Sequence, residues 1–238
     1  MTRTLPIPSL IQEHLRSSAE LELLNTYRGM PICYPAQALS LTETSLQVRV
    51  HNHQAVCLEL HRQTYLVLGG LVISAQVNQG EIKDQTFTLT SFQFAEPSIG
   101  QREMIRVNPR SPLPVVLTNP ETDKYIASEL IDISLNGLGV YGLSVTLGDI
   151  QSFSEGTLIE ARLILPGDEF GSTSNHDIAI KGRIINVMPN KEQGRFRLGI
   201  QIEPEIRNQS IISAYVSQRQ MEIINEIRRL YQTLIQLS

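Results

Sequence analysis

The feature that most constrains the fold is a succession of short β-rich runs separated by turn residues. From residue 32 to about 95, and again from 113 to 202, apolar and polar residues alternate over short stretches. Many short strands without long intervening helices favour closed antiparallel sheets. The sequence therefore predicts an all-β chain with terminal helices, in which two small antiparallel β-barrels follow one another.

In the first block, turn signals stand at Gly69-Gly70 and at 78–80. The expected strands of this block cover 47–51, 55–61, 65–68, 71–77 and 86–94. In the second block, longer loops are expected over 142–156 and 167–175, the latter rich in Gly, Ser, Thr and Asn. The expected strands of the second block are Leu113 to Thr118, Ile126 to Ser134, Gly137 to Gly142, Leu158 to Leu165, Ile178 to Met188 and Arg195 to Ile202.

Helical periodicity marks both ends of the chain. The first predicted helix covers 9–28, with Ser9 as its cap and Gly29 and Pro31 ending it. After Pro204 the pattern is helical to the end, with one apolar stripe that could pack on its own domain or on a second copy of the chain. The stripe consists of Ile223, Ile227, Leu230, Leu234 and Leu237, extended less regularly by Ile212 and Val216.

The segment A-E-P-S-I-G-Q at 95–101 interrupts the strand pattern with a proline and a glycine and indicates a linker. We therefore expect four parts: an N-terminal helix with a barrel over 1–95, a linker and arginine arm over 96–107, a second barrel over 108–204, and a C-terminal helix over 205–238.

Composition narrows the function. The net charge is −4 and the sequence pI about 5.8, which disfavours nucleic-acid binding by bulk charge but leaves room for a local basic site. The two cysteines are too few for a disulfide framework. The N-terminus lacks the apolar core of a signal peptide, and no apolar run approaches the roughly 20 residues of a transmembrane helix. We expect a soluble cytoplasmic protein without membrane contact.

Two short motifs contain the candidate ligand-binding residues. Q-R-E-M-I-R-V at 101–107 places Arg102 and Arg106 four residues apart, and D-I-S-L-N-G runs from Asp132 through Ser134 to Gly137. A guanidinium forms paired hydrogen bonds to phosphate or to a guanine edge, and it can stack on a purine. A carboxylate accepts from guanine nitrogens, a hydroxyl adds a polar contact, and glycine lets a ligand approach the backbone. These residues suit a compact, guanine-containing anion.

The two motifs together resemble the R-x-x-x-R and (D/N)-x-S-x-x-G signature of PilZ domains, and G-R-F-R-L-G-I-Q-I at 194–202 resembles the closing strand of that barrel. The resemblance implies a six-stranded barrel that binds the bacterial second messenger cyclic di-GMP, a ligand rather than a catalytic cofactor. Arg102 and Arg106 would hold guanine and phosphate, and Asp132, Ser134 and Gly137 would line the barrel surface. Ile105 stands where an aromatic residue is common, and Gln101 stands where members binding a stacked ligand pair often have arginine.

A β domain ahead of the PilZ domain is similar to flagellar-brake receptors, in which ligand binding reorients the two domains. The partner would be an effector protein: a motor component, a transcription factor or a polysaccharide synthase. Two alternatives stay open, a degenerate adaptor that binds only proteins and a ligand-controlled transcription regulator. A homodimer through the C-terminal helix is also compatible with the pattern.

Other chemistries have less support in the sequence. No nucleophilic, phosphate-loop or dinucleotide motif recommends an enzyme. His51, His53, Cys57 and His61 lie close together in the sequence, with His51 and His53 expected on one strand face. Without a strict ligand spacing, they are better explained as polar strand residues than as a metal site.

Overall fold

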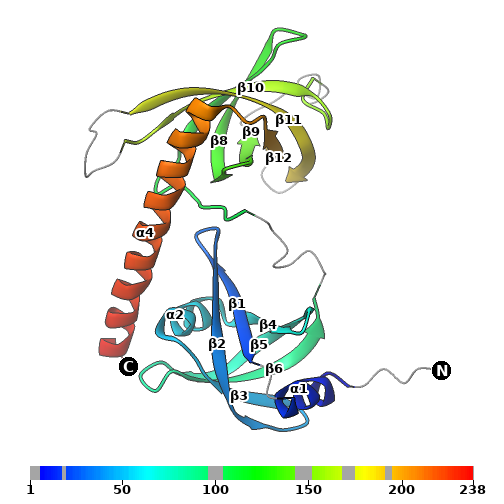
Figure 1. Cartoon of the computed structure of the whole chain (residues 1–238), viewed down its shortest axis with the longest axis vertical. Helices are drawn as coiled ribbons and strands as arrows, with labels where there is room; N and C mark the ends of the chain where they lie inside the picture. Colours follow the sequence, from blue (N-terminus) through cyan, green and yellow to red (C-terminus); the bar gives the residue numbers. More distant parts are fainter. Residues whose placement is uncertain are drawn as a thin grey trace, which may run out of the picture. The chain divides into compact units, whose positions relative to one another are not determined.

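Each β-rich block closes into an antiparallel barrel of six strands, which confirms the predicted architecture of two barrels with terminal helices (Figure 1). The computed structural model describes residues 6–17, 20–95, 104–142, 152–167, 175–190 and 195–237. By their contacts the residues fall into two compact units, one formed by Met1–Glu103 with Ile223–Ser238 and the other by Met104–Glu222.

The first barrel has the strand order β1-β2-β3-β6-β5-β4 and closes through pairing of β1 with β4. Its core is aliphatic apart from Phe87, as expected for a chain without tryptophan. Its elements are α1 (Ile7–Arg16), β1 (Leu21–Tyr27), β2 (Met30–Leu41), β3 (Ser45–Arg49), α2 (Asn52–His61), β4 (Gln63–Leu68), β5 (Leu71–Glu81) and β6 (Thr86–Phe94).

The predicted helix over 9–28 is wrong in its second half, because α1 ends at Arg16 and β1 follows. Tyr27 pairs with Met30 across a two-residue turn in which Arg28 and Gly29 have φ of 51° and 80°. Two successive positive φ values are the geometry of a tight β-hairpin turn. Gly29 therefore turns a hairpin rather than ending a helix. Ser9 lies in the first turn of α1, and Pro6 occupies the cap position.

The strand expected over 55–61 is also wrong, since these residues belong to α2. A short apolar run does not distinguish a buried helix from a buried strand by periodicity. The helix begins where Nδ1 of His51 accepts from the His53 backbone N–H, and it ends at Arg62, which has a left-handed backbone conformation. His51 and His53 accordingly lie at a helix N-terminus and not on one strand face.

The turn expected at 78–80 is absent as well, because β5 continues to Glu81. Gly80 lies within the strand, where a Cβ atom would come within 2.5 Å of the Phe87 ring. Gly80 thus makes room for the fully buried Phe87 side chain, so this glycine serves packing within a strand rather than a turn.

The second barrel has the order β10-β11-β12-β9-β8-β7 and closes through pairing of β10 with β7. The sequence predicted the bounds of β9, β10 and β12 to the residue. Its strands are β7 (Pro114–Asn119), β8 (Lys124–Ser134), β9 (Gly137–Gly142), β10 (Leu158–Leu165), β11 (His176–Asn190) and β12 (Arg195–Ile202).

The C-terminal helix α4 (Ile206–Leu237) contributes residues to both units. Near its start, Nδ2 of Asn208 donates to the Ala179 carbonyl of β11 at 2.8 Å. Farther along, Tyr231, Leu234 and Ile235 pack against the core of the first barrel. Most of the predicted apolar stripe is therefore covered within the chain, and a homodimer through this helix stays a prediction.

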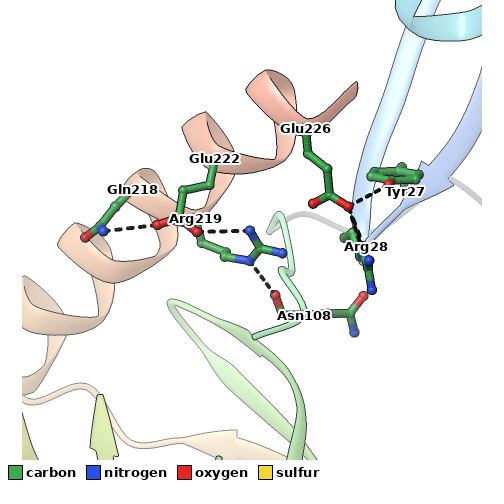
Figure 2. A network of polar contacts seen from close by, with 7 residues as sticks. All are labelled: Tyr27, Arg28, Asn108, Gln218, Arg219, Glu222 and Glu226. Carbon is green, nitrogen blue, oxygen red and sulfur yellow. Dashed lines mark hydrogen bonds and ion pairs between the residues drawn. The ribbon is translucent and has the colours of Figure 1, made fainter. Parts of the chain in front are cut away.

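In its C-terminal portion α4 is also tied to the first barrel by polar contacts. Glu226 accepts from the Tyr27 hydroxyl at 2.8 Å and from Nη2 of Arg28 at 3.2 Å (Figure 2). Burial, followed by the contact with Glu226, raises the pKa of Tyr27.

Among the described residues, no helix combines the length and the apolar character needed to cross a bilayer.

Candidate functional site on the second barrel

The segment before β7 is held against β8 by backbone pairing. Val107 and Ile133 exchange two N–H···O bonds of 3.0 Å, and Nδ2 of Asn108 donates to the Ile131 carbonyl at 2.6 Å. Val107 is fully buried and anchors the segment. The adjacent residue, Arg106, is thereby held beside the C-terminal end of β8.

Asp132 is clasped by two arginines. Its Oδ1 lies 3.3 Å from Nη1 of Arg106, and its Oδ2 lies 2.8 Å from Nη2 of Arg197 on β12. The Asp132 side chain is 7% exposed, whereas those of Arg106 and Arg197 are 27% and 34% exposed. A carboxylate that is so well covered requires paired partners. The two guanidinium groups supply them and keep part of their surface open to solvent.

A β-bulge brings Asp132 to the outer face of the barrel. The register of β8 against β9 shifts between Leu130 and Asp132, so that Leu130 and Ile133 both point into the core. Asp132 and Ser134 consequently face outward, although strict alternation from Leu130 would have turned Asp132 inward.

Glycines stand beside Asp132 on this face. Asp132, Gly139 and Gly199 form one row across β8, β9 and β12, and Ser134 and Gly137 pair in the next row. A Cβ atom on Gly139 would lie 2.9 Å from both carboxylate oxygens of Asp132, and one on Gly137 would lie 3.1 Å from the Ile200 carbonyl. Gly137 and Gly139 are buried, and the Asp132 carboxylate fills the space beside Gly139, whereas Gly199 is half-buried. Backbone is therefore open to a planar ring at Gly199.

The hydroxyl of Ser134 is committed to the turn that follows it. The residue is fully buried, and its Oγ lies 3.1 Å from Oδ1 of Asn136 and 3.3 Å from the Gly137 carbonyl. Hydrogen bonds of this kind fix a strand-turn locally. In this structure the Ser134 hydroxyl stabilises the turn between β8 and β9 and does not face solvent as a free donor.

Of the five predicted site residues, the structure brings together Arg106, Asp132, Ser134 and Gly137. Arg102 lies outside the described residues. Sequence reasoning missed Arg197 and the glycines at 139 and 199. Alternation in R-F-R-L-G-I at 195–200 would have placed Arg197 and Gly199 on the solvent face, but their position beside Asp132 depends on the pairing of β12 with β9, which periodicity does not reveal.

Exposed apolar side chains border this surface. Ile185 and Met188 on β11 are 52% and 53% exposed, and Ile105 beside Arg106 is 45% exposed. Met188 pairs in register with Arg197, and Cγ1 of Ile185 lies 3.7 Å from the position of a Cβ on Gly199. The surface thus offers charged donors, open backbone at Gly199 and an apolar rim, a combination suited to a ligand with anionic and planar parts.

The histidine group in the first barrel has a different organisation. Tyr34 stacks on His51 with ring centroids 4.1 Å apart, and its hydroxyl lies 2.9 Å from Nδ1 of His53. Burial lowers the pKa of both histidines and raises the pKa of the Cys57 thiol to about 12. Among the described residues, no three His, Cys, Asp or Glu side chains gather as metal ligands would.

Comparison with known proteins finds one family match and one relative of low identity. A family model described as the PilZ domain matches residues 101–218. An uncharacterized protein of Aquifex aeolicus (strain VF5) is 26% identical over 147 residues, which are 61% of this chain and 63% of that relative. The match therefore leaves more than a third of the relative uncovered.

Three solved structures align along most of the chain at low identity. K. pneumonia MrkH in complex with c-di-GMP is 14% identical with a TM-score of 0.43, and the alignment covers 94% of each chain. Bacillus subtilis Inhibitor of motility (MotI/DgrA) is 15% identical with a TM-score of 0.43, covering 85% of this chain and 96% of that one. Escherichia coli YcgR in complex with c-di-GMP is 13% identical with a TM-score of 0.41, covering 94% and 93%.

Proposed function

We propose, on the premise that this chain belongs to the PilZ domain family through residues 101–218, that its second barrel is a receptor for cyclic di-GMP. The observation that carries this function is the Asp132 carboxylate held between Arg106 and Arg197 beside the glycines of β9 and β12. The second arginine of one motif and the aspartate of the other thereby lie in contact on one barrel.

The geometry favours different roles for the arginines and for Asp132. Arg106 and Arg197 each use one terminal nitrogen on Asp132, and a guanidinium has five N–H donors. The remaining donors of both arginines can bind phosphate oxygens or the O6 and N7 edge of guanine. In this proposal Asp132 orients the two arginines in the free protein, and its carboxylate accepts from guanine nitrogens when ligand rearranges the pair.

The arm that precedes Arg106 completes the proposed site. Arg102 would close over the ligand from residues 96–107, and the half-buried Gly199 would let a base lie against the backbone, with Gly137 in the barrel surface beneath the ligand. Ordering of this arm would change the relation between the two barrels and would remodel a surface for an effector protein. No catalytic step is part of this mechanism.

Calorimetric titration of cyclic di-GMP into the full chain tests the proposal. Wild-type protein should bind in the low-micromolar range or tighter, and Arg102→Ala/Arg106→Ala and Asp132→Lys should lose binding. Arg162→Ala is the matched control, because Arg162 pairs with Asp177 on other strands of the same barrel. Retained affinity in the double variant, with the fold intact by circular dichroism, would sink the proposal.

The competing functions predict other outcomes. A protein-only adaptor would give no heat of binding in the wild type. A transcription regulator with direct DNA contact would shift DNA at moderate salt, which the net charge of −4 makes unfavourable. The Asp132 carboxylate held by two partly exposed arginines favours the receptor over both.

A further inference from the structure

Arg219 on α4 is a buried cation that contacts the segment before β7. The residue is 4% exposed, its Nε donates to the Asn108 carbonyl at 2.9 Å, and its Nη1 lies 3.0 Å from Oε2 of Glu222 (Figure 2). The other oxygen of Glu222 accepts from Nε2 of Gln218 at 3.1 Å. Burying a guanidinium is costly unless such partners compensate for its lost hydration. These contacts therefore fix the position of the Asn108 carbonyl relative to this part of the helix.

The carbonyl that Arg219 holds lies two residues from the arginine of the proposed ligand site. Asn108 also donates from its side chain to Ile131, and Val107 pairs with Ile133. Ile131 and Ile133 flank Asp132, the partner of Arg106. A continuous series of contacts thus runs from α4 through Asn108 and Val107 to the ion pair of Arg106 with Asp132, all of it within the unit Met104–Glu222.

The segment 104–108 has few attachments to the barrel. Among the described residues, its backbone meets β8 through the single bridge between Val107 and Ile133. Met104 and Ile105 are exposed. Apart from this bridge, the segment is held to β8 through the side chains of Arg106 and Asn108. A charged hydrogen bond to the Asn108 carbonyl therefore helps to fix the position of Arg106.

We propose that Arg219 is a positioning residue for the cyclic di-GMP site, acting through Asn108 to hold Arg106 over β8. This inference rests on the proposed function, which it deepens by naming a point at which α4 regulates the same site. Because coupling between sites is reciprocal, a ligand that moves Arg106 also changes the free energy of the contact between Arg219 and Asn108.

Hydrogen exchange of the full chain without ligand is the first test. In Arg219→Ala the backbone amides of Val107 and Ile133 should exchange about tenfold faster than in the wild type, a change within the range of ordinary coupling between sites. Arg219→Lys should restore part of the protection, because an ammonium group can still donate to the Asn108 carbonyl. Arg229→Ala, an exposed arginine on the same helix, is the matched control and should leave both amides unchanged.

The second test measures cyclic di-GMP affinity in two backgrounds. Arg219→Ala should weaken binding about tenfold in the wild-type background. The loss should be much smaller in the Arg106→Lys background, because the guanidinium that Arg219 positions is already absent there. Equal losses in both backgrounds would overturn the positioning role in favour of a general structural one. Should Arg219→Ala fail to fold, Glu222→Gln loosens Arg219 more gently and replaces it in both tests.

The two proposals fail in different ways. If the wild type binds no cyclic di-GMP, the receptor function fails, while amide exchange still decides whether Arg219 positions the segment. If the wild type binds but amide exchange and affinity are unchanged in Arg219→Ala, the positioning role alone is overturned.

Discussion

At the residue scale, the site depends on side chains that are missing as much as on those that are present. Gly139 leaves the volume that the Asp132 carboxylate occupies, since an added Cβ would lie 2.9 Å from both of its oxygens. A Cβ on Gly199 would meet Asn186 only at 3.5 Å, an ordinary contact distance. Of these two neighbouring glycines, Gly139 is therefore needed for packing against Asp132, and Gly199 for the approach of a ligand.

We expect Gly139→Ala to lower both the free energy of unfolding, by about 1–3 kcal/mol through overpacking, and the affinity for cyclic di-GMP. Gly199→Ala should leave stability nearly unchanged but weaken binding, because its methyl group would stand on the surface where a base approaches. Urea unfolding and calorimetry measure the two effects. Equal stability losses in the two variants, or unchanged affinity in both, would contradict this assignment of roles.

At the element scale, sequence reasoning succeeded where alternation was strict and failed where packing overrode it. Strands β10 and β12 alternate along their whole length between buried and more exposed residues. Strand β9 is buried at nearly every position, and glycines at both of its ends indicated its bounds. Helix α2 was missed because its first residues are buried on all sides, so that no helical stripe is visible. The helix over 9–28 was overextended because the leucines of β1 happen to continue the apolar positions of α1.

The candidate site was predictable only in part for related reasons. Arg106 and Asp132 belong to recognisable motifs, and the structure brings them together. The bulge that turns Asp132 outward, and the strand pairing that places Arg197 beside it, arise from the closed sheet and leave no local sequence signal.

The N-terminus of α2 predicts a pH dependence of stability. Burial lowers the pKa of His51 and His53, and nearby cations at His51 and Arg228 lower that of His53 further. The folded state therefore binds fewer protons than the unfolded state, and stability falls as pH drops below the unfolded value of about 6.5. Protonation of Nδ1 of His51 would also remove the acceptor that caps the helix.

Urea unfolding between about pH 7.5 and pH 5 measures this effect around the unperturbed histidine pKa. The variant His51→Asn/His53→Gln keeps a capping side chain and should show a smaller loss of stability on acidification than the wild type. An identical loss in the two proteins would mean that other groups govern the acid sensitivity.

At the scale of the whole molecule, an acidic chain carries a locally basic surface. The net charge is −4, yet the outer face around Asp132 presents two guanidinium groups against one clasped carboxylate. Such a surface attracts a compact anion without attracting nucleic acid in general. The rest of the chain, a first barrel and a long helix, supplies the proposed route to an effector protein.

Calorimetric titration of cyclic di-GMP into the full chain and into Arg197→Ala decides whether the ligand binds on the Asp132 face of the second barrel. Arg197 lies outside both signature motifs, so its part in binding follows from this structure alone. We expect wild-type affinity in the Arg162→Ala control and at least about a tenfold loss in Arg197→Ala, the effect of losing one charged hydrogen bond. Equal affinity of Arg197→Ala and the wild type would contradict a ligand site on this face of the barrel.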